Sequence, residues 1–393
     1  MDTLIKELNA GFMAAFGTAP QRYFSAPGRT EIGGNHTDHQ LGRVLAAAVD
    51  LDTRAAVRLN GTDTIRLQSE GYPMCQVDVS ELAPKDEEQN TTAALIRGVA
   101  AGFVEAGCPV RGFDAYVMST VLPGSGLSSS AAFEVLIGTI INELFNDGAF
   151  SPDTIARTGQ YAENVYFGKP CGLMDQMACA VGGLVAIDFA DGSVQPVKVN
   201  FARFGHALCI IDTHASHAEL TGEYAAVPAE MMAVAACFGC DVLSQVPQEL
   251  FYAEISALRG RCGDRAVLRA IHFYEENQRV QRQTEALERG DFDAFLQLVK
   301  ESGRSSFMYL QNVTVCGRTD RQEVALALAL CEKYLNGRGA CRVHGGGFAG
   351  TVQAFVPFAL LDDFRAGIDA VLGQGSCRVL SIRREGGIEL EVT

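Results

Sequence analysis

Basic residues are scarce in this sequence. Its 393 residues include 32 Lys and Arg against 47 Asp and Glu, which gives a formal net charge of −15 at pH 7. A surface with this charge repels phosphate backbones and anionic lipid headgroups, so we expect neither nucleic acid nor membrane partners. A small anionic substrate remains compatible, because a few cations and backbone amides are enough to hold one phosphate group.

Long apolar runs and a signal peptide are also missing. The apolar run VALALALC at 324–331 is too short to span a bilayer. The first residues lack the basic start, apolar core and cleavage site of a signal peptide. Twelve cysteines, several of them inside apolar runs, favour reduced thiols over a disulfide framework, and we interpret the lone C-x-x-C of Cys237 and Cys240 as core filler. We therefore expect a cytoplasmic protein, either a monomer or a homodimer.

The length exceeds what one hydrophobic core usually serves, so we predict two domains, 1–200 and 201–393. Hydrophobic periodicity and turn residues predict a mixed α+β fold with antiparallel sheets. An Asp191-Gly192 pair predicts a two-residue hairpin turn. The predicted helices span 4–16, 127–145, 151–167 and much of 228–335. The predicted strands include 44–59, 113–121, the hairpin at 181–199, 207–212, 341–356 and 377–392.

Ligand-capable side chains crowd into APGRTEIGGNHTDHQ at 26–40. Arg29, Glu31, Asn35, His36 and Asp38 lie there among glycines, an arrangement that favours a binding site over a structural role. The H-x-x-H of His36 and His39, and a second one at 214–217, leave a zinc hydrolase conceivable. Neither has the helical H-E-x-x-H pattern of zinc proteases, so we place this alternative last.

A second stretch, LPGSGLSSSAAFEV at 122–135, lies between a predicted strand and a predicted helix. Its glycines allow backbone N–H groups to approach an anion, and the helix start adds free donors and a partial positive charge. No Lys follows as in a P-loop, so that architecture is not indicated. A third stretch, HGGGFAG at 344–350, formally matches a dinucleotide motif, but only 43 residues follow Gly350, too few for that fold.

Asp175 lies in the apolar context of KPCGLMDQMACAVGG. A charge there is unfavourable to bury unless a partner compensates it, so one interpretation is an anionic base next to a cation, although the residues alone favour the structural alternative. A carboxylate in the first turn of a helix is the structural alternative. Glu163, twelve positions upstream, lies on a predicted helix, and its residue type alone gives no reason to single it out.

Taken together and in this order, PGRTEIGGNHTD, GSGLSSSAA, CGLMDQ and GGGFAG resemble the motifs of the GHMP small-molecule kinases, and among these the galactokinases. The resemblance implies a two-domain fold with the active site in the inter-domain cleft, and transfer of the ATP γ-phosphoryl group to the C1 hydroxyl of galactose, with Mg²⁺. It implies Asp175 as the catalytic carboxylate and Arg29 as its partner. The implied sugar-binding residues are Glu31, Asn35, His36, Asp38, Gly172 and Tyr224. The implied nucleotide-binding residues are Gly124, Ser125, Gly126, Leu127, Ser128, Ser129 and Ser130. The implied magnesium ligands are Ser130 and Glu163.

Three residues depart from the galactokinase pattern inside the first motif. Asn35 replaces a Glu that binds the C6 hydroxyl in the family, Glu31 replaces an Asn, and His39 replaces a Tyr. An amide at position 35 would tolerate a C6 carboxylate, which makes a C6-modified galacto sugar such as galacturonate an alternative substrate. In the other alternative, Glu31 takes over the contact and galactose remains the substrate, which we favour. A non-catalytic sugar sensor and another GHMP kinase are the remaining alternatives.

Overall fold

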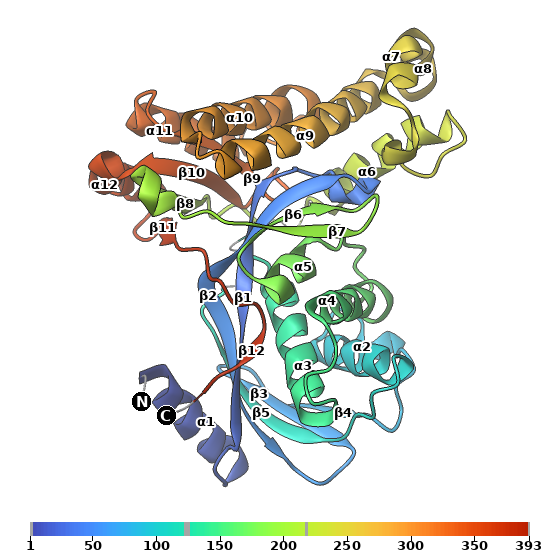
Figure 1. Ribbon diagram of the computed structural model, residues 1–393, viewed down its shortest axis with the longest axis vertical. Coiled ribbons are helices and arrows are strands. Elements are labelled where there is room, and N and C mark those ends of the chain that lie inside the picture. Colours follow the sequence, from blue (N-terminus) through green and yellow to red (C-terminus); the bar gives the residue numbers. More distant parts are fainter. Residues whose placement is uncertain (1–2, 122–125, 217–218, 392–393) are drawn as a thin grey trace.

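A computed structural model describes residues 3–121, 126–216 and 219–391 (Figure 1). Within these ranges the strands form two sheets, one of eight strands and one of four. The large sheet contains β1 (Arg22–Gly33), β2 (Arg43–Leu59), β3 (Thr64–Ser69), β4 (Cys75–Asp78), β5 (Phe113–Ser119), β6 (Leu184–Asp188), β7 (Ser193–Val197) and β12 (Ile388–Glu389). The small sheet contains β8 (His206–Asp212), β9 (Ala340–His344), β10 (Thr351–Pro357) and β11 (Cys377–Leu380).

The large sheet is organised around the long strand β2. One end of β2 pairs with β6 and the other with β5, while β1 runs antiparallel to it along most of its length. Among the described strands only the β3–β5 pair is parallel, so the predicted α+β class with largely antiparallel sheets is confirmed. The β6–β7 hairpin also forms, but Asp188 pairs with Ser193. The connection therefore spans four residues, and the predicted two-residue turn is wrong.

Helices cover both faces of the large sheet (Figure 1). The opening helix α1 packs on one face, where Leu8 and Phe12 are fully buried next to Ala56 of β2, as their four-residue spacing predicts. The opposite face carries α2 to α5, whose apolar side chains form the main core. These elements are α1 (Thr3–Phe16), η1 (Asp38–Gln40), η2 (Asp86–Glu88), α2 (Thr92–Glu105), α3 (Ser129–Phe145), α4 (Pro152–Tyr161), the π-helical turn η3 (Ala162–Phe167) and α5 (Met174–Val181).

Helix α10 packs on one face of the small sheet and α9 packs beside it, reaching β2 of the large sheet, while α11 and α12 cover the opposite face of the small sheet (Figure 1). Phe295 of α10 packs edge-on against Phe355 of β10, with ring centroids 5.1 Å apart. The same buried cluster contains Ile32 and Leu45 of the large sheet, so the two sheets share a core that fixes the space between them. The elements are η4 (Phe201–Phe204), α6 (Thr221–Ala236), η5 (Leu243–Gln245), α7 (Gln248–Ala253), α8 (Ile255–Cys262), α9 (Asp264–Glu288), α10 (Phe292–Ser305), the π-helical turn η6 (Ser306–Leu310), α11 (Glu323–Leu335), η7 (Phe358–Leu360) and α12 (Leu361–Leu372).

The chain passes from the large sheet to the small one between Val197 and His206, close to the predicted boundary. The C-terminal segment then returns, since β12 pairs with β1 and Ile382 bridges to Val49 of β2. This pairing covers the backbone groups of β1 that would otherwise form an open edge. The last segment of the predicted second domain, 201–393, therefore adds a strand to the large sheet. Within the described residues no helix is both long and apolar enough for a membrane crossing.

Candidate active site

The three glycine-containing stretches meet at one cavity of about 260 Å³. Strand β1, the segment before α3, the start of α5 and the turn between β9 and β10 each contribute to its wall. It is lined by Arg29, Gly126, Ser128, Ser129, Ser130, Lys169, Asp175, His344, Gly345, Gly346, Gly347, Ala349, Gly350 and Thr351. Residues 122–125 lie outside the described residues, so the structure says nothing about the predicted Gly124 and Ser125.

Strand β1 is joined directly to the segment that precedes α3. The β1–β2 register shifts between Pro27 and Arg29, and the Arg29 N–H donates to the Leu127 carbonyl over 3.0 Å. A Cβ at Gly28 would lie 3.0 Å from that same oxygen, so a larger residue would push the two segments apart. Arg29 Nη1 also donates to the Gly126 carbonyl over 2.6 Å. These contacts hold the Arg29 guanidinium in the wall of the cavity.

Arg29 and Asp175 form a two-pronged ion pair although 146 residues separate them in the sequence. Arg29 Nε lies 2.7 Å from Asp175 Oδ1, and Nη2 lies 2.8 Å from Oδ2. Arg29 is 6% exposed, whereas the Asp175 side chain keeps 30% of its surface accessible from the cavity. Burial acts to raise the pKa of Asp175, but the charge and hydrogen bonds of Arg29, with help from Ser128 and Lys169, outweigh it and lower that pKa. Asp175 is therefore an anion at neutral pH.

Ser128 ties the segment before α3 to the same carboxylate. Its Oγ donates a short hydrogen bond to Asp175 Oδ2. The backbone of Ser128 is left-handed, with φ of 55° and ψ of 67°, a conformation that non-glycine residues rarely adopt. Strain of this kind is maintained only where surrounding contacts hold it, and it concentrates at functional sites. Asp175 is also the second residue of α5, so the helix start stabilises its charge as well.

The predicted sugar-binding residues converge from separate segments. A Cβ on Gly172 would lie 1.9 Å from Asp38 Oδ2, so these two positions are in direct contact and only glycine fits. The Tyr224 hydroxyl donates to the Gly347 carbonyl over 2.7 Å, and its ring packs on Gly346. His36 Nε2 lies 2.9 Å from the Gly346 carbonyl. The glycine turn at 345–347 thus holds His36 and Tyr224 next to the cavity.

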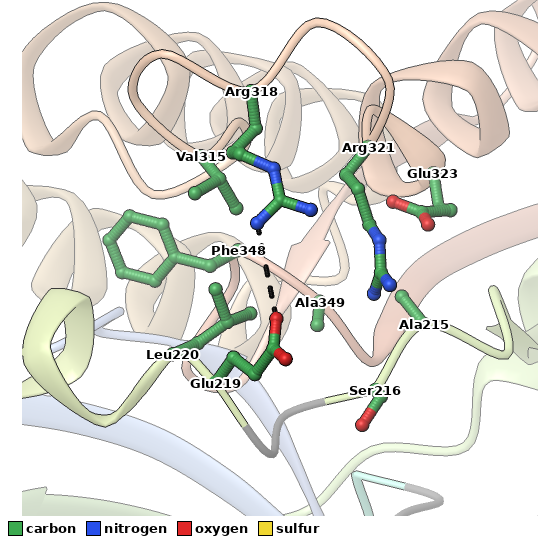
Figure 2. A pocket seen from close by; sticks show the side chains of 10 residues that line it. All are labelled: Ala215, Ser216, Glu219, Leu220, Val315, Arg318, Arg321, Glu323, Phe348 and Ala349. Carbon is green, nitrogen blue, oxygen red and sulfur yellow. Dashed lines mark ion pairs between the residues drawn. The ribbon is translucent and has the colours of Figure 1, made fainter.

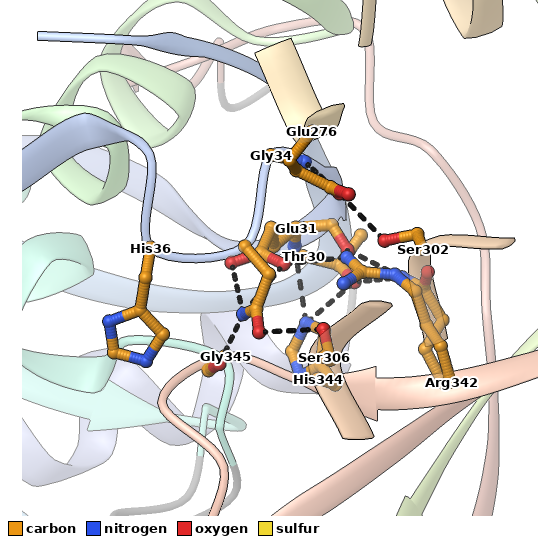
Figure 3. A network of polar contacts seen from close by, with 12 residues as sticks. Thr30, Glu31, Gly34, His36, Glu276, Ser302, Ser306, Arg342, His344 and Gly345 are labelled. Carbon is orange, nitrogen blue, oxygen red and sulfur yellow. Dashed lines mark hydrogen bonds and ion pairs between the residues drawn. The ribbon is translucent and has the colours of Figure 1, made fainter. Parts of the chain in front are cut away.

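Glu31 instead belongs to a buried polar network (Figure 3), and Asn35 Nδ2 donates to its carboxylate. Glu31 Oε1 accepts from Arg342 Nη2 over 2.6 Å, and both side chains are almost fully buried. Asn35 Nδ2 donates to the Gly345 carbonyl over 2.6 Å, while its Oδ1 accepts from Asn312 Nδ2 over 2.8 Å. Protein groups therefore engage both side chains, and neither lines the cavity. Direct contact of Glu31 and Asn35 with a sugar stays a prediction.

His344 is a site residue that the sequence did not reveal. Its Nε2 accepts from the Glu31 backbone N–H over 3.1 Å, which leaves Nδ1 to donate to Thr351 Oγ1 over 2.9 Å. A buried neutral imidazole therefore joins β1 to β9 and β10. A histidine in front of a glycine run gives no pattern from which this role could be inferred. Lys169, Ala349 and Thr351 also line the cavity, and no local sequence pattern marks them as site residues.

Oxygen donors gather on one side of the cavity. Ser130 Oγ donates to Glu163 Oε1 over 3.2 Å, and Lys169 Nζ lies 2.9 Å from the same oxygen. A hydroxyl and a carboxylate suit Mg²⁺, which typically takes one or two protein oxygens and completes its shell with phosphates and water. The contact with Lys169 shows that this carboxylate oxygen already attracts a cation. Among the described residues no three His, Cys, Asp or Glu side chains gather as a metal site.

A second, smaller cavity of about 120 Å³ lies beside the first and shares Ala349 with it (Figure 2). Arg318 and Arg321 point into it from the segment before α11, and Glu219 faces them from the opposite side. Arg318 Nη1 lies 3.9 Å from Glu219 Oε2. Its lining contains two arginines and two glutamates but none of the glycines that line the first cavity.

Comparisons with known proteins agree with this geometry. A family model described as GHMP kinases N terminal domain matches residues 94–183, and one described as a galactokinase galactose-binding signature matches residues 10–59. A galactokinase of Streptomyces coelicolor is 34% identical over 367 residues, covering 92% of this chain and 89% of that protein. A galactokinase of Actinobacillus pleuropneumoniae is 31% identical, covering 88% of each chain.

Solved structures extend the comparison to the whole fold. The crystal structure of Lactococcus lactis galactokinase complexed with galactose has a TM-score of 0.86 and 25% identity, covering 99% of this chain and 100% of that one. A mevalonate kinase structure shares the fold alone, with a TM-score of 0.66 and 14% identity over 93% of this chain and 100% of that one. By its sequence, its fold and the convergence of its motifs, this chain belongs to the galactokinase family within the GHMP kinases.

Proposed function

We propose that this protein transfers the γ-phosphoryl group of ATP to the anomeric hydroxyl of galactose, giving galactose 1-phosphate and ADP. The observation that carries the proposal is the Asp175 carboxylate, held by Arg29 and Ser128 at the floor of a cavity rich in serine and glycine. A sensor that only binds ligands would need no ionised carboxylate fixed at that point. The relatives named galactokinase support the same reaction.

Asp38, Gly172, His36 and Tyr224 form the proposed sugar side of the site. His36 donates from Nε2 to the Gly346 carbonyl, while its Nδ1 has no hydrogen-bond partner among the described residues. A buried acceptor without a partner is unfavourable, so a sugar hydroxyl that donates to it would remove that penalty. The Asp38 carboxylate accepts further hydroxyl donors. Glu31 and Asn35 act indirectly, because they fix the turn that carries His36.

Gly126, Leu127 and Ser128 to Ser130 form the proposed nucleotide side, together with Gly124 and Ser125 as the sequence predicts. The N-terminus of α3 begins at Ser129 and offers backbone N–H groups and a partial positive charge to phosphates. Arg29 and Lys169 add cationic charge at the cavity. The oxygens of Ser130 and Glu163 fit Mg²⁺, which supplies charge neutralisation on the phosphates when bound.

Asp175 acts as the general base in this proposal. The proton of the C1 hydroxyl passes to the carboxylate while the C1 oxygen bonds to the γ-phosphorus, and the bond from that phosphorus to the bridging oxygen of ADP breaks. The lowered pKa keeps Asp175 free of a proton at neutral pH, which a general base requires. Phosphates that approach Arg29 share its charge, which weakens its hold on Asp175 and makes the carboxylate more basic as the reaction begins.

The proposed setting is the cytoplasm, with the protein as a monomer or a homodimer. The twelve cysteines are free thiols, including Cys237 and Cys262, whose Sγ atoms lie 3.3 Å apart without a bond. Free thiols agree with a reducing compartment. Light scattering during size-exclusion chromatography measures the assembly directly.

A panel of galactose, galacturonate, N-acetylgalactosamine and L-arabinose tests the proposal by coupled detection of ADP. We expect galactose to be turned over fastest and ³¹P NMR to place the new phosphate on C1. Release of ADP that does not depend on any sugar would contradict the kinase assignment. If galacturonate is turned over orders of magnitude faster than galactose, the substrate assignment changes to galacturonate, while the proposed transfer to the C1 hydroxyl stands.

A further inference from the structure

A buried amide lies directly behind the proposed metal ligand. Gln176 of α5 and Glu134 of α3 are fully buried, and Glu163 of η3 is nearly so. Gln176 Nε2 donates to Glu134 Oε2 over 2.9 Å and to Glu163 Oε2 over 2.9 Å, and it lies 3.7 Å from Cys171 Sγ. One NH₂ group therefore bridges two carboxylates that come from different elements.

The chemistry of the three groups determines how the amide is oriented. Oε2 of Glu134 and Oε2 of Glu163 each accept one hydrogen bond, and the NH₂ end of an amide carries the two donors that this requires. The reverse orientation would place the Gln176 oxygen against two carboxylate oxygens. Gly159 of α4 closes the space from another side, because a Cβ there would lie 3.2 Å from Gln176 Cγ and from Glu134 Oε2. Gln176 is consequently held in one position.

The two carboxylate oxygens of Glu163 face opposite directions, one toward the cavity and the other toward the protein interior. Oε1 contacts Ser130 Oγ and Lys169 Nζ, both of which belong to residues that line the cavity. Oε2 is held from the protein interior by Gln176. Adjacent residues of a helix project about 100° apart, so Asp175 reaches Arg29 while Gln176 points into the core. The first turn of α5 thus carries both Asp175, which pairs with Arg29, and Gln176, which holds Glu163.

We propose that Gln176, anchored by Glu134, is a positioning residue that presents Glu163 Oε1 to a divalent cation bound with the nucleotide. This inference rests on the proposed function, since it assumes that Glu163 is a metal ligand. Partners that orient a metal ligand commonly matter nearly as much as the ligand itself. The bridge also links the metal ligand to the helix that carries the base, so the two are set by one structural unit.

The Gln176→Met substitution in the full-length protein tests the role, because it keeps the side-chain length and removes both donors. We expect Mn²⁺ affinity, measured by electron paramagnetic resonance with ADP present, to fall by about 10- to 100-fold. The half-saturating Mg²⁺ concentration for turnover should rise by a similar factor, kcat should recover at high Mg²⁺, and the KM for galactose should stay near the wild-type value. A role in folding alone would lower the melting temperature and leave the Mn²⁺ affinity unchanged.

Gln283→Met is the matched control, because Gln283 is also a fully buried glutamine on a helix, α9. It should leave Mn²⁺ affinity unchanged. Should Gln176→Met fail to fold, Glu134→Met removes the oxygen that accepts from Gln176 and should weaken Mn²⁺ binding in the same direction. Wild-type Mn²⁺ affinity in the folded variant would overturn the inference.

Glu163→Gln separates this inference from the proposed function. If Glu163→Gln weakens Mn²⁺ binding and Gln176→Met does not, only the positioning role is overturned. If Glu163→Gln itself leaves Mn²⁺ binding unchanged, the proposed metal site fails and the inference fails with it.

Discussion

Acid should destabilise this protein through the buried imidazole of His36. Burial, and after it the charges of His39 and other cations, lowers the pKa of His36 to about 3. An unfolded histidine has a pKa of about 6.5, so between these two values the unfolded chain binds a proton that the folded protein does not. Because the folded-state pKa is the lower one, this contribution to stability is complete above the unfolded pKa and is lost as the pH falls toward the folded one.

The magnitude follows from the two pKa values. Proton linkage gives a loss of about 2 kcal/mol at about pH 5, and about 3 kcal/mol at about pH 4, from His36 alone. His272 and His344 add losses of the same sign, since burial lowers the pKa of each of them. His36 and His272 hydrogen-bond to backbone carbonyls, of Gly346 and Asn35 respectively, that flank the proposed sugar site.

The His36→Gln variant isolates the effect, because glutamine keeps an N–H donor for Gly346 and does not titrate. Urea unfolding followed by far-ultraviolet circular dichroism suits this protein, which has no tryptophan. Between about pH 7.5 and about pH 5, the wild-type free energy of unfolding should fall by about 2 kcal/mol more than that of the variant. His214→Gln, at a side chain that is 56% exposed, serves as the control. Equal losses in wild type and His36→Gln would refute the reasoning.

Two further substitutions probe the cavity itself. Ser128→Ala removes the hydrogen bond to Asp175. Because a hydrogen bond to a charged group is worth about 1.5 to 3 kcal/mol, we expect kcat to fall by about 10- to 100-fold. An unchanged kcat would show that Ser128 does not hold the base. Gly172→Ala places a methyl group 1.9 Å from Asp38 Oδ2, so the KM for galactose should rise by at least about tenfold while the KM for ATP holds, and equal effects on both would contradict a local role.

Much of the site was predictable because the motifs are short and their chemistry is local. The pairing of Arg29 with Asp175, and the contact of Ser130 with Glu163, follow the roles that the family resemblance implies. The four-residue spacing of apolar side chains identified α1, apolar and β-branched runs identified β2 and β5, and the serines at its start identified α3. These elements carry strong signals that do not depend on distant partners.

What the sequence did not reveal depends on long-range contacts. Gln176 bridges two carboxylates that lie 42 and 13 residues away, and His344 joins strands more than 300 residues apart. The return of β12 to β1 is likewise set by an open sheet edge, which no local pattern reports. The ion pair of Glu31 with Arg342 was not foreseen either, because Arg342 lies far along the chain on β9.

The account depends above all on Asp175 taking the sugar proton. Rapid-quench measurement of galactose 1-phosphate formation by Asp175→Asn, with both substrates saturating, tests this step alone. We predict a chemical step slower by about 10²- to 10⁴-fold, with nucleotide affinity within a few-fold of wild type. Formation of product at a near-wild-type rate in that variant would contradict the central claim.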